Sequence, residues 1–313
     1  MTAHNELIPT ATIPHFSGLA SAFWAAFCWG TATVMSKGAL REFAPVTLLC
    51  IQLTSSVIFL WAIVLWRKQP KVGRNNIMKF AWLGLLEPGL AYFLGLWGLE
   101  KTEASIATLI QSSEAMMIIV VSVLILRERP TRRMILLSLF SFSGLVLAVC
   151  SSNVPVTLGY FAGNLLIFLG TLVAAFYAVL VSRAANHGDA FYIIAWQQTV
   201  ALIFALSLMG IQAAGTNALR LPEQLDYSLL ALAVCSGIVQ YAFAFVFNIT
   251  ALRTLSANIA GSFLSLVPLF GMVGGYLFLN EVPTIIQLIG VGITLISVVS
   301  ISLMGHRNRS LES

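Results

Sequence analysis

The sequence predicts an all-α integral membrane protein with ten transmembrane helices, arranged as two inverted repeats of five helices each. Three observations predict this fold: an apolar composition, ten apolar stretches long enough to cross a membrane, and similarity between the two halves of the chain. Of the 313 residues, 58% are hydrophobic and 9% are charged, whereas soluble domains carry about 25% charged residues. A chain of this composition cannot cover a soluble surface, so we expect membrane lipid to surround it.

Ten apolar stretches have the length of about 20 residues that a membrane helix needs. Charged residues, polar turns and clusters of Gly, Pro or Asn separate them. The predicted spans are residues 17–36, 45–66, 79–98, 104–126, 133–151, 158–181, 190–210, 227–249, 255–279 and 285–304.

The distribution of basic residues predicts that both termini are cytoplasmic. With the N-terminus inside, thirteen Lys and Arg residues lie on the cytoplasmic side, and four, Lys37, Arg41, Lys101 and Arg220, lie on the other side. Membrane proteins concentrate Lys and Arg in cytoplasmic loops, which favours this orientation. The same rule accounts for the net charge of +5, and we expect no nucleic-acid partner.

The two halves of the chain are similar when one is shifted by 153 residues. Residues 99–131 then fall on residues 252–284, and both stretches end in Glu-x-Pro-Thr. We assign residues 17–151 to the first repeat and residues 158–304 to the second. Because five spans are an odd number, the second repeat must enter the membrane upside down. Many secondary transporters are built in this way, with the substrate site near the midplane between the repeats.

Motifs in both repeats also resemble a known family. The stretches AAFCWGTATVMSK and AAFYAVLVSR correspond, as do GLEKTEASIATLIQSSEAMMIIVVSVLILRERPT and ALRTLSANIAGSFLSLVPLFGMVGGYLFLNEVPT. They resemble the EamA-type branch of the drug/metabolite transporter superfamily over roughly residues 17–304. The resemblance implies a carrier of the cell inner membrane that moves small organic solutes. Its cavity would be lined mainly by the first, third, fourth, sixth, eighth and ninth helices.

Glu87 and Glu114 are the two carboxylates deep inside predicted spans. A charged side chain at the centre of a membrane helix costs about 2.5–3.5 kcal/mol, so we expect both to face a cavity or polar partners. At a rise of 1.5 Å per residue, Glu87 lies about 12 Å along its helix and Glu114 about 16 Å along the next. Both depths are near the midplane of a core about 30 Å thick. The alternative is a structural hydrogen bond between helices.

Two functional roles stay open for these carboxylates: carrying a coupling proton, or holding the ammonium group of an amino-acid-like or cationic substrate. Gln111 shares a helix face with Glu114 by its three-residue spacing. Gln240 is the repeat equivalent of Glu87 at the shift of 153. Aromatic side chains on the predicted cavity helices suit aromatic or cationic solutes, although lipid-facing positions are the alternative for each. They are Trp24, Trp29, Tyr92, Tyr177, Tyr241 and Phe245.

Glu87 is followed directly by Pro88 and Gly89. Proline removes a helix hydrogen bond, and glycine allows a close approach, so we predict a kinked polar patch at mid-depth. A kink that serves packing is the alternative. Pro268 predicts a similar break in span 255–279, at a slot where the EamA-type family often has proline. Ala115 stands at the equivalent position of span 104–126, which departs from that family pattern.

Other polar or small residues inside the spans favour structural interpretations. Gln52, Gln197 and Gln198 predict hydrogen bonds between helices, with a gating role as the alternative. Gly271 and Gly275 are four residues apart, which is typical of closely packed membrane helices.

Glu128 and Glu281 occupy matching positions in the two repeats, each shortly before a proline. A carboxylate beside a helix N-terminus is stabilised by the helix dipole. We therefore interpret both as structural residues.

Together these features predict a secondary transporter that works by alternating access and exports a small metabolite, such as an amino acid or a related amphipathic compound. Drug or cation efflux by the same fold is the alternative, and a proton is a candidate coupling ion. A membrane-embedded enzyme or a channel are further alternatives, but the sequence has no nucleophile or phosphate-loop motif. We expect no cofactor and no metal site, because the four cysteines are scattered without ligand spacing. Whether the protein is a monomer or a homodimer stays open.

Overall fold

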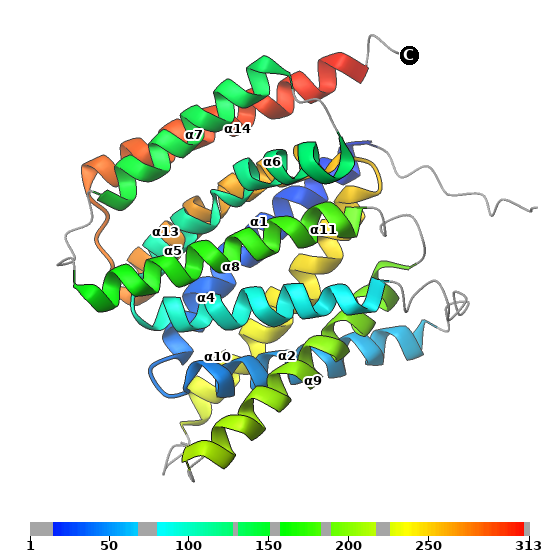
Figure 1. Ribbon diagram of the computed structural model, residues 1–313, viewed down its shortest axis with the longest axis vertical. Helices are drawn as coiled ribbons and strands as arrows, with labels where there is room; N and C mark the ends of the chain where they lie inside the picture. Colours follow the sequence, from blue (N-terminus) through cyan, green and yellow to red (C-terminus); the bar gives the residue numbers. More distant parts are fainter. Residues whose placement is uncertain are drawn as a thin grey trace, which may run out of the picture.

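A computed structural model describes residues 15–67, 80–127, 131–150, 157–182, 189–216 and 226–309. The regular elements in these ranges are helices, as predicted, and Figure 1 shows them packed side by side. Residue 79, the first of the predicted span 79–98, and residue 151, the last of the span 133–151, lie outside the described residues. Glu128 and Arg220 also lie outside them.

The helical elements follow the predicted apolar stretches. The first half of the chain contains α1 (His15–Ala39), α2 (Pro45–Trp66), the 3-10 turn η1 (Trp82–Leu85), the π turn η2 (Leu86–Leu90), α4 (Ala91–Glu100), α5 (Ala104–Gln111), α6 (Glu114–Leu126) and α7 (Arg132–Cys150). The second half contains α8 (Leu158–Ser182), α9 (Ala190–Thr216), α10 (Tyr227–Gly237), the π turn η3 (Ile238–Phe243), α11 (Ala244–Leu252), α12 (Ala257–Ser262), the 3-10 turn η4 (Phe263–Leu266), α13 (Val267–Leu279) and α14 (Ile285–Arg309).

Seven helical stretches in the described part of the chain are long and apolar enough to cross a membrane. They overlap seven of the predicted spans, and the shorter apolar helices Ile135–Gly144 and Ile285–Ser297 overlap two more. The remaining span, 79–98, is divided among η1, η2 and α4. The total of ten membrane helices and the cytoplasmic location of the termini therefore stay predictions.

Irregularities in the two halves recur at the spacing of 153 residues. α5 begins at Ala104 and α12 at Ala257, and the π turn η2 around Glu87 corresponds to η3 around Gln240. The residue after α6, Arg127, and the residue after α13, Asn280, both adopt left-handed backbone conformations, with φ of 56° and 59°. These matched helix ends and breaks fit a chain built from two repeats.

Helix pairing follows the same relation. α1 packs along α11, α4 packs along α8, α2 pairs with α9, and α7 pairs with α14. In terms of predicted spans, these are 1 with 8, 3 with 6, 2 with 7 and 5 with 10, so exchanging the repeats reproduces every pair. Figure 1 shows α7 and α14 side by side at one edge and α2 and α9 at the other. The helices α1, α4, α8 and α11 lie between these two edges (Figure 1).

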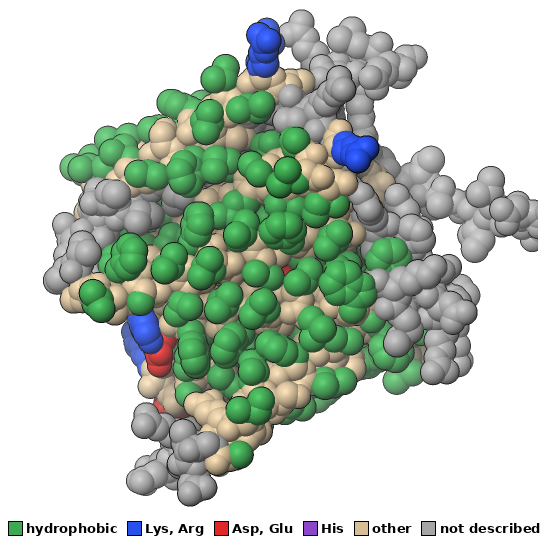
Figure 2. Space-filling view, viewed as in Figure 1, with side chains coloured by type: hydrophobic (Ala, Val, Ile, Leu, Met, Phe, Trp, Pro, Cys, Tyr) green, Lys and Arg blue, Asp and Glu red, His purple; other side chains and the backbone are tan. Residues whose placement is uncertain are grey.

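The outer surface is apolar, as a membrane protein requires. In Figure 2 hydrophobic side chains cover most of the visible face, and most of the charged side chains in view lie toward its margins. Large apolar side chains on the helices are exposed, such as Trp24 at 48% and Leu124 at 70%. In water such an exposed apolar surface would drive association, whereas in a membrane it contacts lipid tails. Trp24 therefore has the lipid-facing position that was the alternative for each aromatic residue.

Candidate functional site

A cavity of about 60 Å³ lies in the interior of the bundle. Its walls come from α1, η2, α4, α5, α6, α8, η3, η4 and α13, which belong to the first, third, fourth, sixth, eighth and ninth predicted spans. The lining includes all six residues predicted to bind substrate or protons: Glu87, Glu114, Gln111, Tyr92, Gln240 and Trp29. A second, smaller cavity shares Trp29, Glu87 and Glu114.

Glu87 enters the cavity because its helix is broken at that residue. Its backbone is extended, with φ −142° and ψ 127°, and the following peptide bond to Pro88 is cis. Pro88 and Gly89 are buried, and a regular helix resumes at Ala91. The Glu87 side chain is 6% exposed and lines the cavity. The predicted kink at Glu-Pro-Gly is confirmed, and it presents the carboxylate to the interior rather than to lipid.

Glu114 lines the cavity as the first residue of α6. The predicted span 104–126 corresponds to one apolar helical stretch, Ala104–Ile125, with a turn at Ser112 and Ser113 between α5 and α6. Both serine hydroxyls bond back to the preceding turn, to the Leu109 oxygen at 2.6 Å and the Ile110 oxygen at 2.7 Å. Such back-bonding competes with the helix for its carbonyl groups. A break thus forms here without a proline.

The equivalent break in the second repeat is η4, which is followed by Pro268. Pro268 is buried in the first turn of α13, where its missing N–H is not needed by the helix. The break predicted from Pro268 is therefore present. Ala115, the residue at the same place in the first repeat, does not prevent a break there.

Hydrogen bonds hold the neutral polar residues of the cavity. The Ser36 hydroxyl donates to Gln240 Oε1 at 2.9 Å, and Gln52 Nε2 donates to the hydroxyls of Ser36 at 2.8 Å and Ser236 at 2.7 Å. The network links helices of both repeats, which confirms the interhelical bonds predicted for Gln52. The network also fixes the orientation of Gln240, which is the repeat equivalent of Glu87.

A second hydrogen-bond network surrounds Gln197 and Gln198 in α9. The Tyr177 hydroxyl donates to Gln197 Oε1 at 2.9 Å, and Gln197 Nε2 donates to the Phe80 backbone oxygen at 3.1 Å. Gln198 Nε2 donates to the Tyr241 backbone oxygen at 2.9 Å. These bonds confirm the interhelical prediction for both glutamines. These bonds pair both oxygen and nitrogen of the Gln197 amide in an apolar interior, whereas Gln198 Oε1 has no partner within the described residues.

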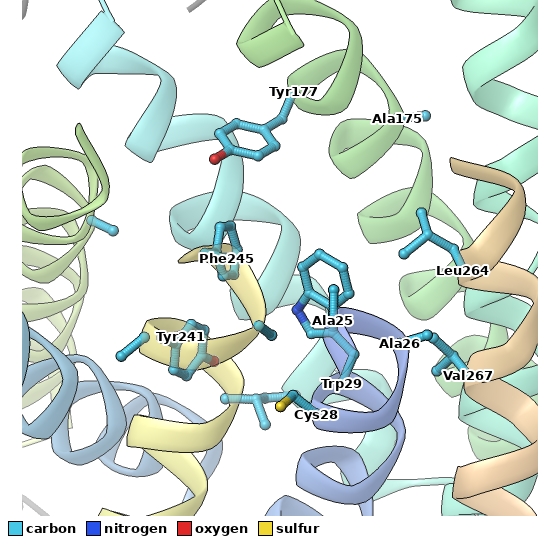
Figure 3. Packing of buried hydrophobic residues seen from close by; sticks show 14 of the residues in the cluster. Ala25, Ala26, Cys28, Trp29, Ala175, Tyr177, Tyr241, Phe245, Leu264 and Val267 are labelled. Atoms are coloured by element: carbon cyan, nitrogen blue, oxygen red, sulfur yellow. The ribbon is translucent and has the colours of Figure 1, made fainter. Parts of the chain in front are cut away.

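Aromatic rings gather near the cavity, and Figure 3 shows Trp29, Tyr177, Tyr241 and Phe245 close to one another. Phe245 lies at the centre of this group, with ring centroids 5.5 Å from Trp29, 5.9 Å from Tyr177 and 6.5 Å from Tyr241. The Tyr92 ring lies 4.7 Å from the Tyr241 ring. Phe245 and Tyr241 are buried as packing behind the wall, whereas Trp29 and Tyr92 line the cavity itself.

The chemistry of the lining is acidic and aromatic. Two carboxylates lie among the residues around the cavity, and none of those residues is basic. The buried Nε1 of Trp29 has no hydrogen-bond partner within the described residues. No group of three or more His, Cys, Asp and Glu side chains able to hold a metal ion occurs in that part of the chain. The site therefore offers two carboxyl groups and several hydrogen-bond donors, among them Trp29 Nε1, to a small solute.

Comparison with known proteins gives the family. The sequence profile of the EamA-like transporter family matches residues 16–150 and again residues 161–303. This chain belongs to the EamA-like transporter family. An "Uncharacterized transporter" of Methanothermobacter thermautotrophicus is 25% identical over 293 residues, which cover 86% of this chain and 81% of that protein. A solved crystal structure with 17% identity has a TM-score of 0.70, covers 95% of this chain and 99% of the other, and shows the same fold.

The EamA-like family membership makes this chain a multi-pass membrane transporter of a small-molecule substrate in a lipid environment. It points to transport and away from catalysis. The resemblance seen in the sequence motifs is confirmed, and so is the transporter class.

Several cavity residues of this EamA-like transporter were not predicted. Thr33 and Thr171 line the cavity, but each hydroxyl bonds the oxygen four residues earlier in its own helix. Leu264 lines both cavities beside the break in the second repeat. A signal was available for Leu264, since the break marked by Pro268 lies beside it. Nothing in the sequence distinguishes the two threonines from other threonines on apolar helices.

The packing roles predicted for glycines are met in part. A Cβ on Gly89 would lie 2.9 Å from the Gly84 oxygen and 3.3 Å from Phe204, so the glycine permits a close approach within the kink. A Cβ on Gly271 would overlap the Thr108 side chain of α5, which agrees with the predicted helix packing. A Cβ on Gly275 would instead meet the Glu281 carboxylate. The second glycine of the pair thus accommodates a charged side chain, not a helix.

Proposed function

We propose that this chain is a secondary transporter that exports a small metabolite, such as an amino acid or a related amphipathic compound, by alternating access. The observation that carries the proposal is the pair Glu87 and Glu114 in one interior cavity between the two repeats, without a basic side chain among the lining residues. Carboxylates buried among apolar helices are costly and mark substrate or proton pathways in membrane proteins. The pseudo-twofold helix pairing supports the alternating-access part, because exchanging the repeats inverts the direction of opening.

Trp29 supports an amino-acid-like substrate. Its Nε1 is buried without a partner among the described residues, in a side chain that lines both cavities with the two carboxylates. A buried N–H that stays unpaired costs free energy, so a solute that carries an acceptor would satisfy it. A zwitterion with a short apolar body carries both an ammonium group, which Glu87 or Glu114 would bind, and an acceptor, which Trp29 would bind. Efflux of cationic drugs uses the same acidic and aromatic surface and is the second candidate.

The size of the cavity indicates that the site must change shape during transport. A volume of about 60 Å³ holds a few water molecules. A solute of amino-acid size requires the lining helices to move apart, toward one side of the membrane at a time. Opening of the two sides in turn is what the proposal requires.

Flux in proteoliposomes tests this function. Purified protein is reconstituted, loaded with unlabelled amino acids or organic amines, and exposed to trace labelled solute outside. A carrier gives saturable uptake that is accelerated by counterflow, and a pH gradient alters the rate if protons are coupled. Unsaturable flux without counterflow contradicts a carrier and indicates a channel. Chemical conversion of the solute indicates an enzyme. Saturable flux of permanent cations but not of amino acids selects the second candidate.

A further inference from the structure

The connection between α4 and α5, residues 101–103, is held on one side by Lys37. This side chain belongs to α1 and donates from Nζ to the backbone oxygens of Leu99 at 2.8 Å and Glu100 at 3.3 Å. Both oxygens lie at the C-terminal end of α4, where carbonyl groups have no partner within the helix. A cation is also stabilised at that end by the helix dipole. Lys37 thus ties α1 to the end of α4.

The other side of the same connection is held by Glu281. This residue follows α13, and its carboxylate accepts hydrogen bonds from the backbone N–H groups of Ala104 at 2.8 Å and Ser105 at 2.9 Å. These groups start α5, so the negative charge meets a helix N-terminus, where it is stabilised. A Cβ on Gly275 would lie 2.7 Å from the carboxylate, so the glycine leaves the space it occupies. We call these contacts of Lys37 and Glu281 the Lys37–Glu281 clamp.

The clamp is asymmetric between the repeats. The residue before α5, Glu103, makes no side-chain capping bond, whereas Ser256, at the equivalent position, caps α12 by accepting from the Ile259 N–H. The start of α5 therefore depends on a carboxylate from the other repeat, and the start of α12 has a cap of its own. A cap supplied by another helix is lost when the helices separate, but a local cap is kept.

The clamp lies directly against the wall of the cavity. Leu99 lines the cavity, and its backbone oxygen is the closer acceptor of Lys37. Entry of a solute from this end requires α4 and α5 to separate from α1 and α13, and that movement breaks both arms of the clamp. We propose that the Lys37–Glu281 clamp keeps this end of the cavity closed, and that its release opens the cavity toward the α4–α5 connection.

The surroundings of the clamp suit contacts that form and break. Lys37 and Glu281 are half-buried, and they line a cavity at the margin of the bundle together with Arg41 and Glu100. Burial, and then the charge of Glu281, raise the pKa of the neighbouring Glu103, while Lys37 opposes this shift. Charged groups are therefore concentrated at this end of the bundle. Because water reaches them in part, separation exposes the charges to solvent rather than to the apolar interior.

Access of a reagent to the cavity tests the clamp. Gly95 lines the cavity, and a Cβ added there meets nothing within 4 Å, so Gly95→Cys is a suitable reporter once the four native cysteines are replaced. A membrane-impermeant thiol reagent is applied to vesicles of either orientation, and the labelling rate is measured from each side. The test variants are Lys37→Gln and Glu281→Gln, which keep much of the side-chain length and remove the charge.

Matched controls remove the same charges from the same connection. Lys101→Gln and Glu100→Gln alter an exposed side-chain ion pair of 3.4 Å and keep the Glu100 backbone oxygen that belongs to the clamp. Each test variant is expected to raise labelling from the α4–α5 side by roughly threefold or more, the order expected for one charge at a helix end. The controls are expected to leave it unchanged. Unchanged labelling in both test variants overturns the proposal, and so does an equal rise in the controls.

Two conservative variants separate the clamp from a general loss of folding. Lys37→Arg and Glu281→Asp keep the charges and are expected to label close to the parent rate. If Lys37→Gln or Glu281→Gln is not recovered as folded protein, labelling of the other variant tests the proposal. This is possible because Lys37 holds the end of α4 and Glu281 holds the start of α5. The assay measures access to the cavity and not transport. The clamp is therefore supported or rejected even if the transport function proposed above is disproved.

Discussion

Gly84 lies directly against the backbone of Gln197, so that a Cβ at position 84 would overlap the Gln197 carbonyl group. Its repeat equivalent, Gly237, meets the backbone of Gln52 in the same way. The two glutamines occupy matching places in α2 and α9 and are 0–1% exposed. Each repeat thus packs a glycine of a broken helix against a glutamine of the other repeat, which holds the buried amide networks in position.

Replacement of either glycine by alanine is expected to destabilise the protein. The added methyl group meets backbone rather than a flexible side chain, so the helices must separate, at a cost of about 1–3 kcal/mol. Gly84→Ala and Gly237→Ala should lower the thermal unfolding midpoint in detergent. Gly210→Ala is the matched control, because a Cβ there meets nothing within 4 Å. Midpoints equal to that of the control variant would show that the packing is looser than described.

A pair of buried serines should respond differently to the same change. Ser236 accepts from Gln52 and donates to the Ala233 oxygen at 2.8 Å, whereas the buried hydroxyl of Ser56 has no partner within the described residues. Ser236→Ala leaves part of Gln52 unpaired and should cost about 1–3 kcal/mol, while Ser56→Ala should be neutral or stabilising. Thermal unfolding of both variants decides. A larger loss for Ser56→Ala would contradict the network.

Glu103→Gln is expected to stabilise the protein at neutral pH. Burial and the charge of Glu281 raise the pKa of Glu103 above its usual value, which is about 4.3, so the ionised form is less favourable in the folded chain than in the unfolded one. The gain from the neutral variant should be largest above the raised pKa. It should disappear as the pH falls below about 4.3, where Glu103 is protonated in both states.

Unfolding midpoints of wild type and Glu103→Gln, measured at pH 7 and pH 4, test this dependence. Glu100→Gln, on the same connection and exposed, is the control and should change neither midpoint. A gain for Glu103→Gln that persists at pH 4 would show that charge is not its cause.

Neutralising Glu87 or Glu114 is expected to separate their two proposed roles. A carboxylate that carries the coupling proton should, as Glu87→Gln or Glu114→Gln, lose uptake driven by a pH gradient but keep counterflow. A carboxylate that binds the substrate amine should lose both, by tenfold or more if a charge-assisted contact of about 1.5–3 kcal/mol is removed. Wild-type flux for both variants in both assays would remove the carboxylates from the mechanism. Glu100→Gln, whose carboxylate is exposed outside the central cavity, is the control.

Trp29→Phe is expected to weaken the binding of zwitterionic substrates more than the binding of plain amines. The change keeps an aromatic ring in the cavity wall and removes the Nε1 donor, which has no partner within the described residues. Loss of one hydrogen bond should raise KM about threefold to tenfold for an amino acid and leave an amine without an acceptor unaffected. Parallel flux measurements with an amino acid and its decarboxylated amine test this. Equal effects on both would place the donor away from the substrate.

Much of this architecture can be read from local sequence. The apolar stretches predict the helices because a lipid environment requires about 20 apolar residues per span. The Glu-Pro-Gly kink is predictable because proline disrupts a helix wherever it occurs in the interior. The turn at Ser112 and Ser113 inside the span could not be predicted, because serine hydroxyls compete with the helix only when the tertiary context lets them bond back. The corresponding place in the second repeat carries Pro268, which follows the 3-10 turn η4.

The sequence by itself determined the membrane class, the repeat period and the two acidic residues that had to be kept from lipid, since hydropathy and the cost of buried charge act residue by residue. Only the tertiary structure decided that Glu87, Glu114, Gln240 and Trp29 line one cavity. It also decided that Glu281 stabilises α5 and not a helix near it in sequence. The physical reason is that helix packing selects which unpaired groups meet, and the partners of Glu281 lie 176 and 177 residues away along the chain.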